Sequence, residues 1–157
     1  MRELKRGRVR VLVDIVREPS TLPESLSGRL TGSRCAANLF RAFRASVPLP
    51  ESKEAFLCAC LDAKHKPIGI ETVSIGSLQG SIVHPREVFR PAVILAAAAI
   101  VICHNHPSGD PKPSYEDESV TDRLKEAGRI LGIPLLDHII LGDDRYWSTA
   151  EERYSSY

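Results

Sequence analysis

The feature that most constrains this chain is an apolar run that ends in two histidines. Residues 96–103 (AAAAIVIC) are all apolar, and His104 and His106 follow with one asparagine between them. An apolar run of this length with β-branched residues at its end predicts a buried strand with a helical lead-in. Because side chains alternate along a strand, histidines at i and i+2 point to the same face and converge on one point.

A second set of polar residues follows the histidines after a loop rich in proline and glycine. The turns of this loop, residues 107–113, can bring Ser114 and Asp117 back toward the histidines. Two imidazoles and one carboxylate supply three ligands with an open fourth position, the pattern of a catalytic zinc site. The structural alternatives are a coincidental His-x-His pair at a loop edge and a capping box formed by Ser114 and Asp117. Both signals in this order, at the end of a buried strand, favour the metal site.

These residues resemble the metal-binding signature of the JAB/MPN (JAMM) metalloproteases, His-x-His followed after seven residues by Ser-x-x-Asp. The longer string from His104 to Pro111 (HNHPSGDP) resembles the RadC branch of that superfamily, and the resemblance extends over about residues 52–152. It implies an α/β (α+β) fold of the JAB1/MPN type, a mixed β-sheet flanked by helices and related to the cytidine-deaminase-like fold. It also implies one zinc ion per chain, with His104, His106 and Asp117 as its ligands.

Hydrolysis at such a site requires a group that takes a proton from the attacking water. JAMM proteases use a glutamate at the start of an upstream strand, and the resemblance assigns this role to Glu54. Glu51, in a proline-flanked turn, and Glu71, inside a predicted strand, are the alternatives. The resemblance also assigns Ser114 the role of stabilising the oxyanion. The expected function is a zinc-dependent metallopeptidase or isopeptidase that acts on a protein or peptide substrate.

Two other functions were weighed against this one. The first is a RadC-type DNA-repair-associated or scaffold module without protease activity, although such a module would not need the ligand trio together with Glu54 and Ser114. The second is a zinc deaminase, which requires His-x-Glu followed by Pro-Cys-x-x-Cys. Neither deaminase motif occurs in the chain.

The chain is expected to consist of a basic N-terminal extension, residues 1–50, with a helix at about 33–46, and a RadC-like JAB/MPN domain, residues 51–157. The helix-hairpin-helix module that precedes the metal domain in RadC-type proteins is not recognisable. Residues 1–46 carry ten Lys/Arg against four Asp/Glu. The basic start, residues 1–10, suggests contact with nucleic acid, and a solvated tail or a first strand is the alternative.

Location and redox state follow from what the sequence lacks. No apolar run reaches the length of a membrane span, and the basic N-terminal residues do not form a signal peptide. A cytoplasmic protein without a membrane partner is therefore expected. The four cysteines show no Cys-x-x-Cys spacing and are expected to be buried thiols, with a thiolate pair of Cys58 and Cys60 as the alternative. Cys103 is expected to point away from the metal.

Periodicity and turn residues predict the remaining elements. They are strands at 55–61 and 68–75 forming a hairpin, a short strand at 82–83, helices at 86–89 and 93–97, a helix at 115–131, and strands at 135–141 and 145–148. Pro91 is expected to break or kink the helix that begins at residue 86. His138 alternates with Leu136 and Ile140, which predicts a packed, hydrogen-bonded side chain, whereas His65 is expected to be solvated.

Overall fold

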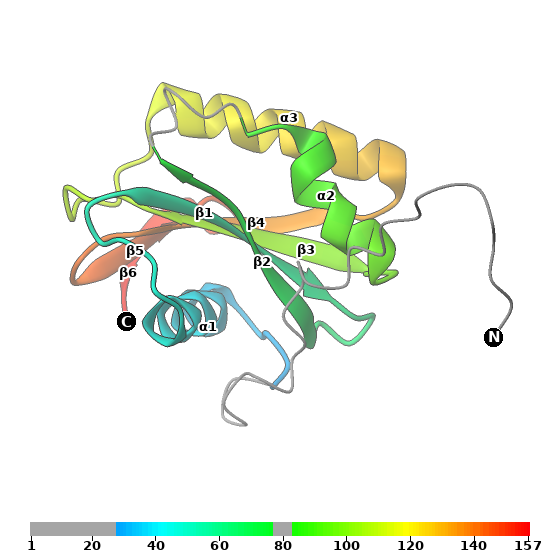
Figure 1. The fold of residues 1–157 in the computed structure, drawn as a ribbon, viewed down its shortest axis with the longest axis horizontal. Helices are drawn as coiled ribbons and strands as arrows, with labels where there is room; N and C mark the ends of the chain where they lie inside the picture. Colours follow the sequence, from blue (N-terminus) through cyan, green and yellow to red (C-terminus); the bar gives the residue numbers. More distant parts are fainter. Residues whose placement is uncertain (1–27, 77–82) are drawn as a thin grey trace, which may run out of the picture.

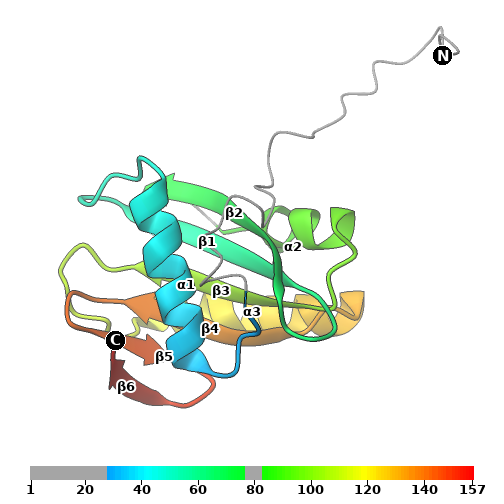
Figure 2. The ribbon, with the colours of Figure 1, turned by 90° about the horizontal axis from the view of Figure 1, so that it is seen from below.

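The computed structural model describes residues 28–76 and 83–157. In chain order the elements are α1 (Ser33–Ser46), β1 (Glu54–Leu61), β2 (Pro67–Gly76), α2 (Pro85–Ile94), β3 (Ala99–Asn105), α3 (Tyr115–Leu131), β4 (Leu135–Leu141), β5 (Arg145–Ser148) and β6 (Arg153–Ser156). A six-stranded sheet lies between α1 on one face and α2 and α3 on the other (Figures 1 and 2). The predicted mixed sheet flanked by helices is confirmed.

The sheet has the order β2-β1-β3-β4-β5-β6, and β3 and β4 are its one parallel pair among the described strands. Every residue of β3 is buried, as expected for a strand covered by helices on both faces. β1 runs antiparallel to β3 with Phe56 opposite His104. The start of β1 and the end of β3 therefore lie at the same edge of the sheet, where the two histidines leave it.

Helix α1 has the predicted bounds and packs into the core. Its apolar stripe contacts residues of β1, β3 and β4, and the buried members of the stripe are Ala36, Ala37, Leu39, Phe40 and Phe43. α1 lies across one face of the sheet (Figure 2), and the division expected at residue 50 stays a prediction. The basic residues 1–10 lie outside the described residues.

Helix α2 corrects the expectation at Pro91. A break or a kink was predicted there, and α2 continues without a break through Pro91 to Ile94. A proline inside a helix costs about 3 kcal/mol. Burial of Pro91 together with Val88, Phe89 and Ala92 against the sheet offsets this cost. The lead-in to β3 is a turn in which Ala96 has a φ of 51°, not a helix.

The other elements agree with the sequence, with two exceptions. The hairpin, the helix α3 and the strands β4 and β5 are confirmed, but β6 was not predicted, because four residues with two serines give little alternation. β6 pairs with β5, and the rings of Trp147 and Tyr154 lie 4.8 Å apart. Val83 is not in a strand, and the rest of the predicted strand at 82–83 lies outside the described residues.

Three of the four cysteines are buried as expected, whereas Cys35 is half-buried. Cys58, Cys60 and Cys103 are buried and free, and the pKa of Cys58 is raised by its hydrogen bond with Cys60 and by burial. Burial also raises the pKa of Cys103 well above its usual value, so the thiols of Cys58 and Cys103 are neutral. Cys103 packs in the core under α1, on the face opposite His104, as predicted. Within the described residues, no helix has the length and apolar character needed to span a bilayer.

Candidate metal centre

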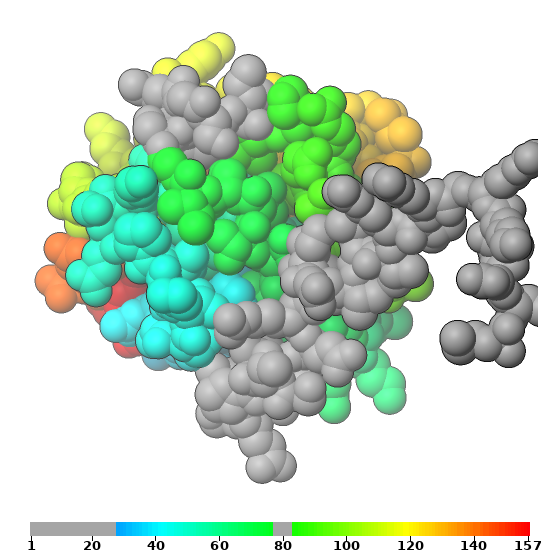
Figure 3. Space-filling view, in the orientation of Figure 1, coloured from blue at the N-terminus to red at the C-terminus, as the bar shows by residue number. Residues whose placement is uncertain are grey.

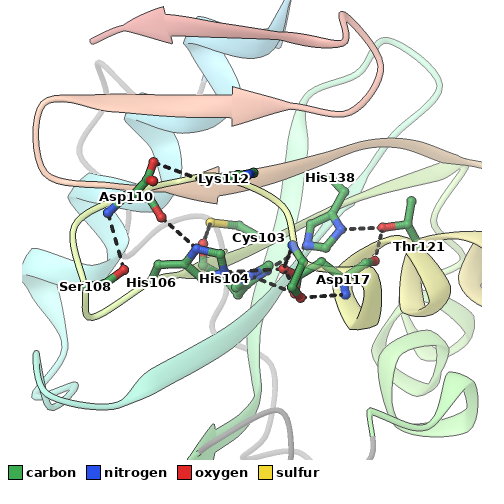
Figure 4. Close-up of polar contacts among 10 residues, drawn as sticks. Cys103, His104, His106, Ser108, Asp110, Lys112, Asp117, Thr121 and His138 are labelled. Carbon is green, nitrogen blue, oxygen red and sulfur yellow. Dashed lines mark hydrogen bonds and ion pairs between the residues drawn. The ribbon is translucent and has the colours of Figure 1, made fainter.

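Two histidines and one aspartate meet at the edge of the sheet. His104 lies near the end of β3, His106 follows that strand directly, and Asp117 lies in the first turn of α3. The nitrogen His104 Nε2 is 2.9 Å from His106 Nε2 and 3.1 Å from Asp117 Oδ1, and His106 Nε2 is 3.4 Å from Asp117 Oδ2. The three side chains point toward one another (Figure 4), and one ligand atom from each lies within 4.8 Å of the others.

The loop between the histidines and α3 is packed against the turn that joins β4 and β5. Gly109 has a φ of 81°, which favours glycine, and Asp143 occupies the space that a side chain at Gly109 would need. Asp143 N donates a hydrogen bond to Gly109 O in the loop, and His106 N donates one to Leu141 O, both at 3.0 Å. These contacts direct the chain back from the sheet edge to the start of α3.

Ser114 and Asp117 form the capping box that the sequence analysis named as the structural alternative. Ser114 N and Ser114 Oγ both donate to Asp117 Oδ2 at 2.7 Å, and Asp117 N donates to Ser114 Oγ at 3.2 Å. This reciprocal arrangement starts α3 and orients the Asp117 carboxylate toward the histidines. The hydroxyl hydrogen of Ser114 is thus used within the site, so its role at an oxyanion stays a prediction.

The tautomer of His106 follows from its partner. His106 Nδ1 lies 2.8 Å from the carbonyl oxygen Asp110 O, which only accepts hydrogen bonds. His106 Nδ1 therefore carries the hydrogen and donates it. In the neutral imidazole this leaves a lone pair on His106 Nε2, the nitrogen that faces Asp117.

The tautomer of His104 is set by a buried relay through Thr121 and His138. Thr121 Oγ1 donates its single hydrogen to Asp117 O at 2.7 Å, so it accepts from His138 Nδ1 at 2.6 Å. Burial lowers the pKa of His138 well below its usual value, so the ring is neutral and His138 Nε2 is an acceptor. His104 Nδ1 then donates to His138 Nε2 at 2.8 Å, and His104 Nε2 keeps a lone pair.

The site fits a cation. The two imidazole Nε2 atoms face each other and a carboxylate, and Asp117 Oδ1 is buried without a hydrogen-bond partner in the described part of the chain. Burial would raise the pKa of Asp117, but close contact with His104 and His106 holds it well below its usual range. Bonds of about 2.0–2.2 Å to a tetrahedral zinc separate donor atoms by roughly 3.3–3.5 Å, so a small widening of the present distances would admit the ion.

His138 was expected to be a packed, hydrogen-bonded side chain, and this is confirmed. It is 1% exposed and, through its bond to His104, orients a candidate metal ligand from outside the candidate ligand set. Thr121, which completes the relay, was not singled out from the sequence. A threonine four residues after Asp117 on the same helix face was the available signal.

Replacing His138 by phenylalanine is expected to lower zinc affinity by about 10- to 100-fold, because His104 loses the acceptor that fixes its tautomer. Zinc affinity is measured by competition with a chromophoric chelator. The control is His84→Phe, which changes a half-buried histidine at the start of α2. Equal zinc affinity in the folded His138 variant and the wild type would contradict the positioning role.

Glu54 is the first residue of β1 and is half-buried. Continuing the antiparallel register, in which Phe56 pairs with His104, places Glu54 opposite His106 on the same face of the sheet. Its charge contributes, after the larger effect of Asp117, to the raised pKa of His106. Glu54 also lines a cavity of about 430 Å³ together with Lys53 and Pro107. It is therefore next to the ligand group without being part of it.

The side chain of Asn105 forms hydrogen bonds with the residues on either side of Glu54. Its side-chain oxygen accepts hydrogen bonds from Ala55 N at 2.9 Å and from Arg44 Nη1 at 2.5 Å, and its side-chain nitrogen donates to Lys53 O at 3.1 Å. These bonds hold the start of β1 against the end of β3. This residue was not singled out from the sequence, although a polar residue at the end of a buried run was a signal.

The two alternative glutamates differ in their distance from the site. Glu51 is exposed and lines, together with His106, a cavity beside α1. Glu71 is 7% exposed and lies opposite Cys58 on β2, where its Oε2 atom has no hydrogen-bond partner among the described residues. Burial raises the pKa of Glu71 to about 7, against the opposing effect of Arg90.

Replacing Glu71 by glutamine is expected to stabilise the protein above pH 7 by about 1 kcal/mol, a value reduced for solvent screening of the carboxylate. The pKa of an unfolded glutamate is about 4.3, so folding favours the protonated form. The stability that protonated Glu71 contributes to the folded state is complete below about pH 4.3 and is lost as the pH rises through about 7. Denaturant unfolding at pH 5.5 and pH 8 measures it, with the exposed Glu126→Gln as control. An unchanged pH dependence in the Glu71 variant would contradict the assignment.

The comparisons with known proteins agree with this geometry. The family model described as RadC-like JAB domain matches residues 33–154. A UPF0758 protein of Caldanaerobacter subterraneus is 58% identical over 106 residues, which cover 68% of this chain and 46% of the relative. UPF0758 proteins of Methanosarcina barkeri and Bacillus licheniformis are 52% and 55% identical over 66% of this chain, and cover 45% and 46% of those relatives. The chain thus spans less than half the length of these curated relatives.

Proposed function

Because this chain belongs to the RadC-like JAB domain family, we propose that it is a zinc-dependent metallopeptidase or isopeptidase of the JAMM type. The observation that carries the proposal is the convergence of His104 Nε2 and His106 Nε2 on the buried carboxylate of Asp117, whose Oδ1 atom lacks a hydrogen-bond partner among the described residues. Glu54, a carboxylate outside the ligand group, lies opposite His106. This combination of ligands and an adjacent base supports hydrolysis.

The donor set favours zinc among the common metals. Two imidazoles and one carboxylate match the three-ligand sets of catalytic zinc sites, which keep a fourth position for water or substrate. The side chain of His106 is 14% exposed, whereas those of His104 and Asp117 are almost fully buried. Solvent and substrate therefore approach from the side of His106.

The residues of the chain divide the proposed reaction among them. When bound, zinc lowers the pKa of a water molecule to about 7 and polarises the substrate carbonyl. Glu54 takes the proton of the attacking water and returns it to the amine that leaves. His138 and Thr121 hold His104, and Ser114 holds Asp117 through the capping box. To stabilise an oxyanion, the hydroxyl of Ser114 must turn from Asp117 to the substrate.

The alternative is a RadC-type DNA-repair-associated or scaffold module without protease activity, which is also compatible with the family. Contact with nucleic acid would involve the basic residues 1–10, which lie outside the described residues, and it stays a prediction. The same is true of the cytoplasmic location. Within the described residues, the buried carboxylate of Asp117 and the two lone pairs favour the metal-dependent hydrolase.

Metal content and hydrolysis, measured on the same preparation, test this proposal. Protein purified without added metal is expected to contain about one zinc per chain by elemental analysis. It is also expected to cleave members of a panel of peptides and isopeptide-linked proteins. This cleavage should stop when a chelator is added and resume when zinc is restored. Failure to bind zinc on titration would overturn the metal site. Zinc binding without cleavage of any substrate in the panel would favour the scaffold module.

A further inference from the structure

A cavity that two arginines line lies beside His106 on the side of α1. Its volume is about 460 Å³, and its lining includes Arg41 and Arg44 of α1, Asn105 and His106 at the end of β3, and Tyr157. The segment that carries both arginines lies at the molecular surface (Figure 3, cyan). The cavity adjoins the one metal ligand that is partly exposed, so a substrate that reaches His106 can also reach these arginines.

Both guanidinium groups are held in place by uncharged partners. Arg44 Nη1 donates to Asn105 Oδ1 at 2.5 Å. The guanidinium carbon of Arg41 lies 3.8 Å from the centroid of the Tyr157 ring, and Tyr157 is itself anchored by a hydrogen bond from its hydroxyl to Gly142 O at 2.8 Å. In the described part of the chain, neither arginine forms an ion pair with a carboxylate.

The two positive charges are therefore not neutralised by direct contact with a carboxylate among the described residues. Arg41 and Arg44 are three residues apart, so they lie on the same face of α1, where like charges disfavour each other. Fixing each long side chain also costs conformational entropy. Two acidic residues also line the cavity, but the carboxylate of Asp143 lies against Gly109 and Glu51 is exposed. Preorganised guanidinium groups with free donors match a carboxylate, which accepts hydrogen bonds in the plane of the fork.

We propose that this cavity is a substrate subsite that binds a carboxylate of the peptide, through Arg41 and Arg44, next to the bond that is cleaved at the metal centre. The carboxylate is either an acidic side chain or the C-terminus of the peptide. This inference rests on the proposed function, since it names the chemical class of the substrate for the same site. It predicts that acidic peptides are preferred over neutral peptides of the same length.

The test measures binding rather than cleavage, by NMR titration of the zinc-loaded full chain. Three pentapeptides with acetylated N-termini serve as probes: Ac-Gly-Gly-Glu-Gly-Gly-amide, its glutamine analogue, and the glutamine peptide with a free C-terminal carboxylate. At least one acidic peptide is expected to bind about tenfold more tightly than the neutral one, the difference that one charged hydrogen bond provides. Which acidic peptide binds more tightly identifies the source of the carboxylate.

The variants Arg41→Gln and Arg44→Gln are each expected to abolish most of this tenfold preference for the acidic peptide. Arg41→Gln leaves the Arg44–Asn105 hydrogen bond in place, so it tests the subsite even if Arg44→Gln does not fold. The matched control is Arg34→Gln, which removes an exposed charge from the same helix outside the cavity. An equal affinity for neutral and acidic peptides, or an equal loss in the Arg34 variant, would overturn the proposal.

Two further outcomes separate this subsite from the metal centre. A carboxylate that binds the zinc itself would lose affinity when zinc is removed and would be insensitive to Arg41→Gln, and this result also overturns the proposal. If acidic peptides bind through the arginines but no peptide is ever cleaved, the subsite stands and the proposed hydrolase fails. If peptides are cleaved without any preference for acidic ones, the proposed hydrolase stands and the subsite fails.

Discussion

The variant His106→Ala is expected to reduce zinc from about one per chain to a trace and to reduce amide hydrolysis to the background rate. His106 supplies one of three ligands, and the loss of a ligand should exceed the 10- to 100-fold effect of changing a supporting residue. Its side chain is 14% exposed, so its truncation leaves a smaller cavity in the core than truncation of His104 would. Elemental analysis after dialysis measures the zinc, and circular dichroism checks the fold.

A matched control for this variant is His84→Ala, which removes a half-buried histidine outside the site. It should retain the zinc and the activity of the wild type. A folded His106→Ala protein that keeps stoichiometric zinc would show that this histidine is not a ligand, whatever its position in the structure.

The variant Glu54→Gln is expected to keep its zinc and to lose about 10²- to 10⁴-fold in the rate of amide hydrolysis, the usual effect of removing a positioned acid–base group. Glutamine has the shape of glutamate but does not accept a proton near neutral pH. The ligand atoms of His104, His106 and Asp117 are untouched, so zinc content separates this effect from loss of the metal. The exposed Glu126→Gln serves as the control for charge.

Full activity in Glu54→Gln would move the base to another carboxylate, and Glu51→Gln and Glu71→Gln are then the variants to compare. A companion variant, Ser114→Ala, also tests the capping box. It should lower the stability of the protein by about 1 kcal/mol through loss of the N-cap. The oxyanion role of Ser114 would be supported if this variant keeps its zinc and its rate of hydrolysis falls well below that of other variants that destabilise α3.

Local residue patterns were sufficient for most of the elements and for the grouping of the three candidate ligands. The apolar run before His104 predicts a buried strand because its residues have no polar side chain to hydrate, and the alternation of side chains places His104 and His106 on one face. The start of α3 is also a local matter, since Ser114 and Asp117 satisfy each other's backbone groups. Pro91 was misjudged because its cost is local, whereas the burial that offsets it comes from packing against the sheet.

Contacts between distant segments were decided only by the tertiary structure. The sequence by itself determined the chemical groups of the site and their order, because their spacing along one strand and one helix start is local. The fold determined that His138, 34 residues from His104, fixes the tautomer of that ligand, and that Asn105 joins Arg44 and the start of β1 to the same edge. It also placed α1 in the core and brought its arginines beside His106. These pairings depend on strand register and helix packing, which no short window of sequence contains.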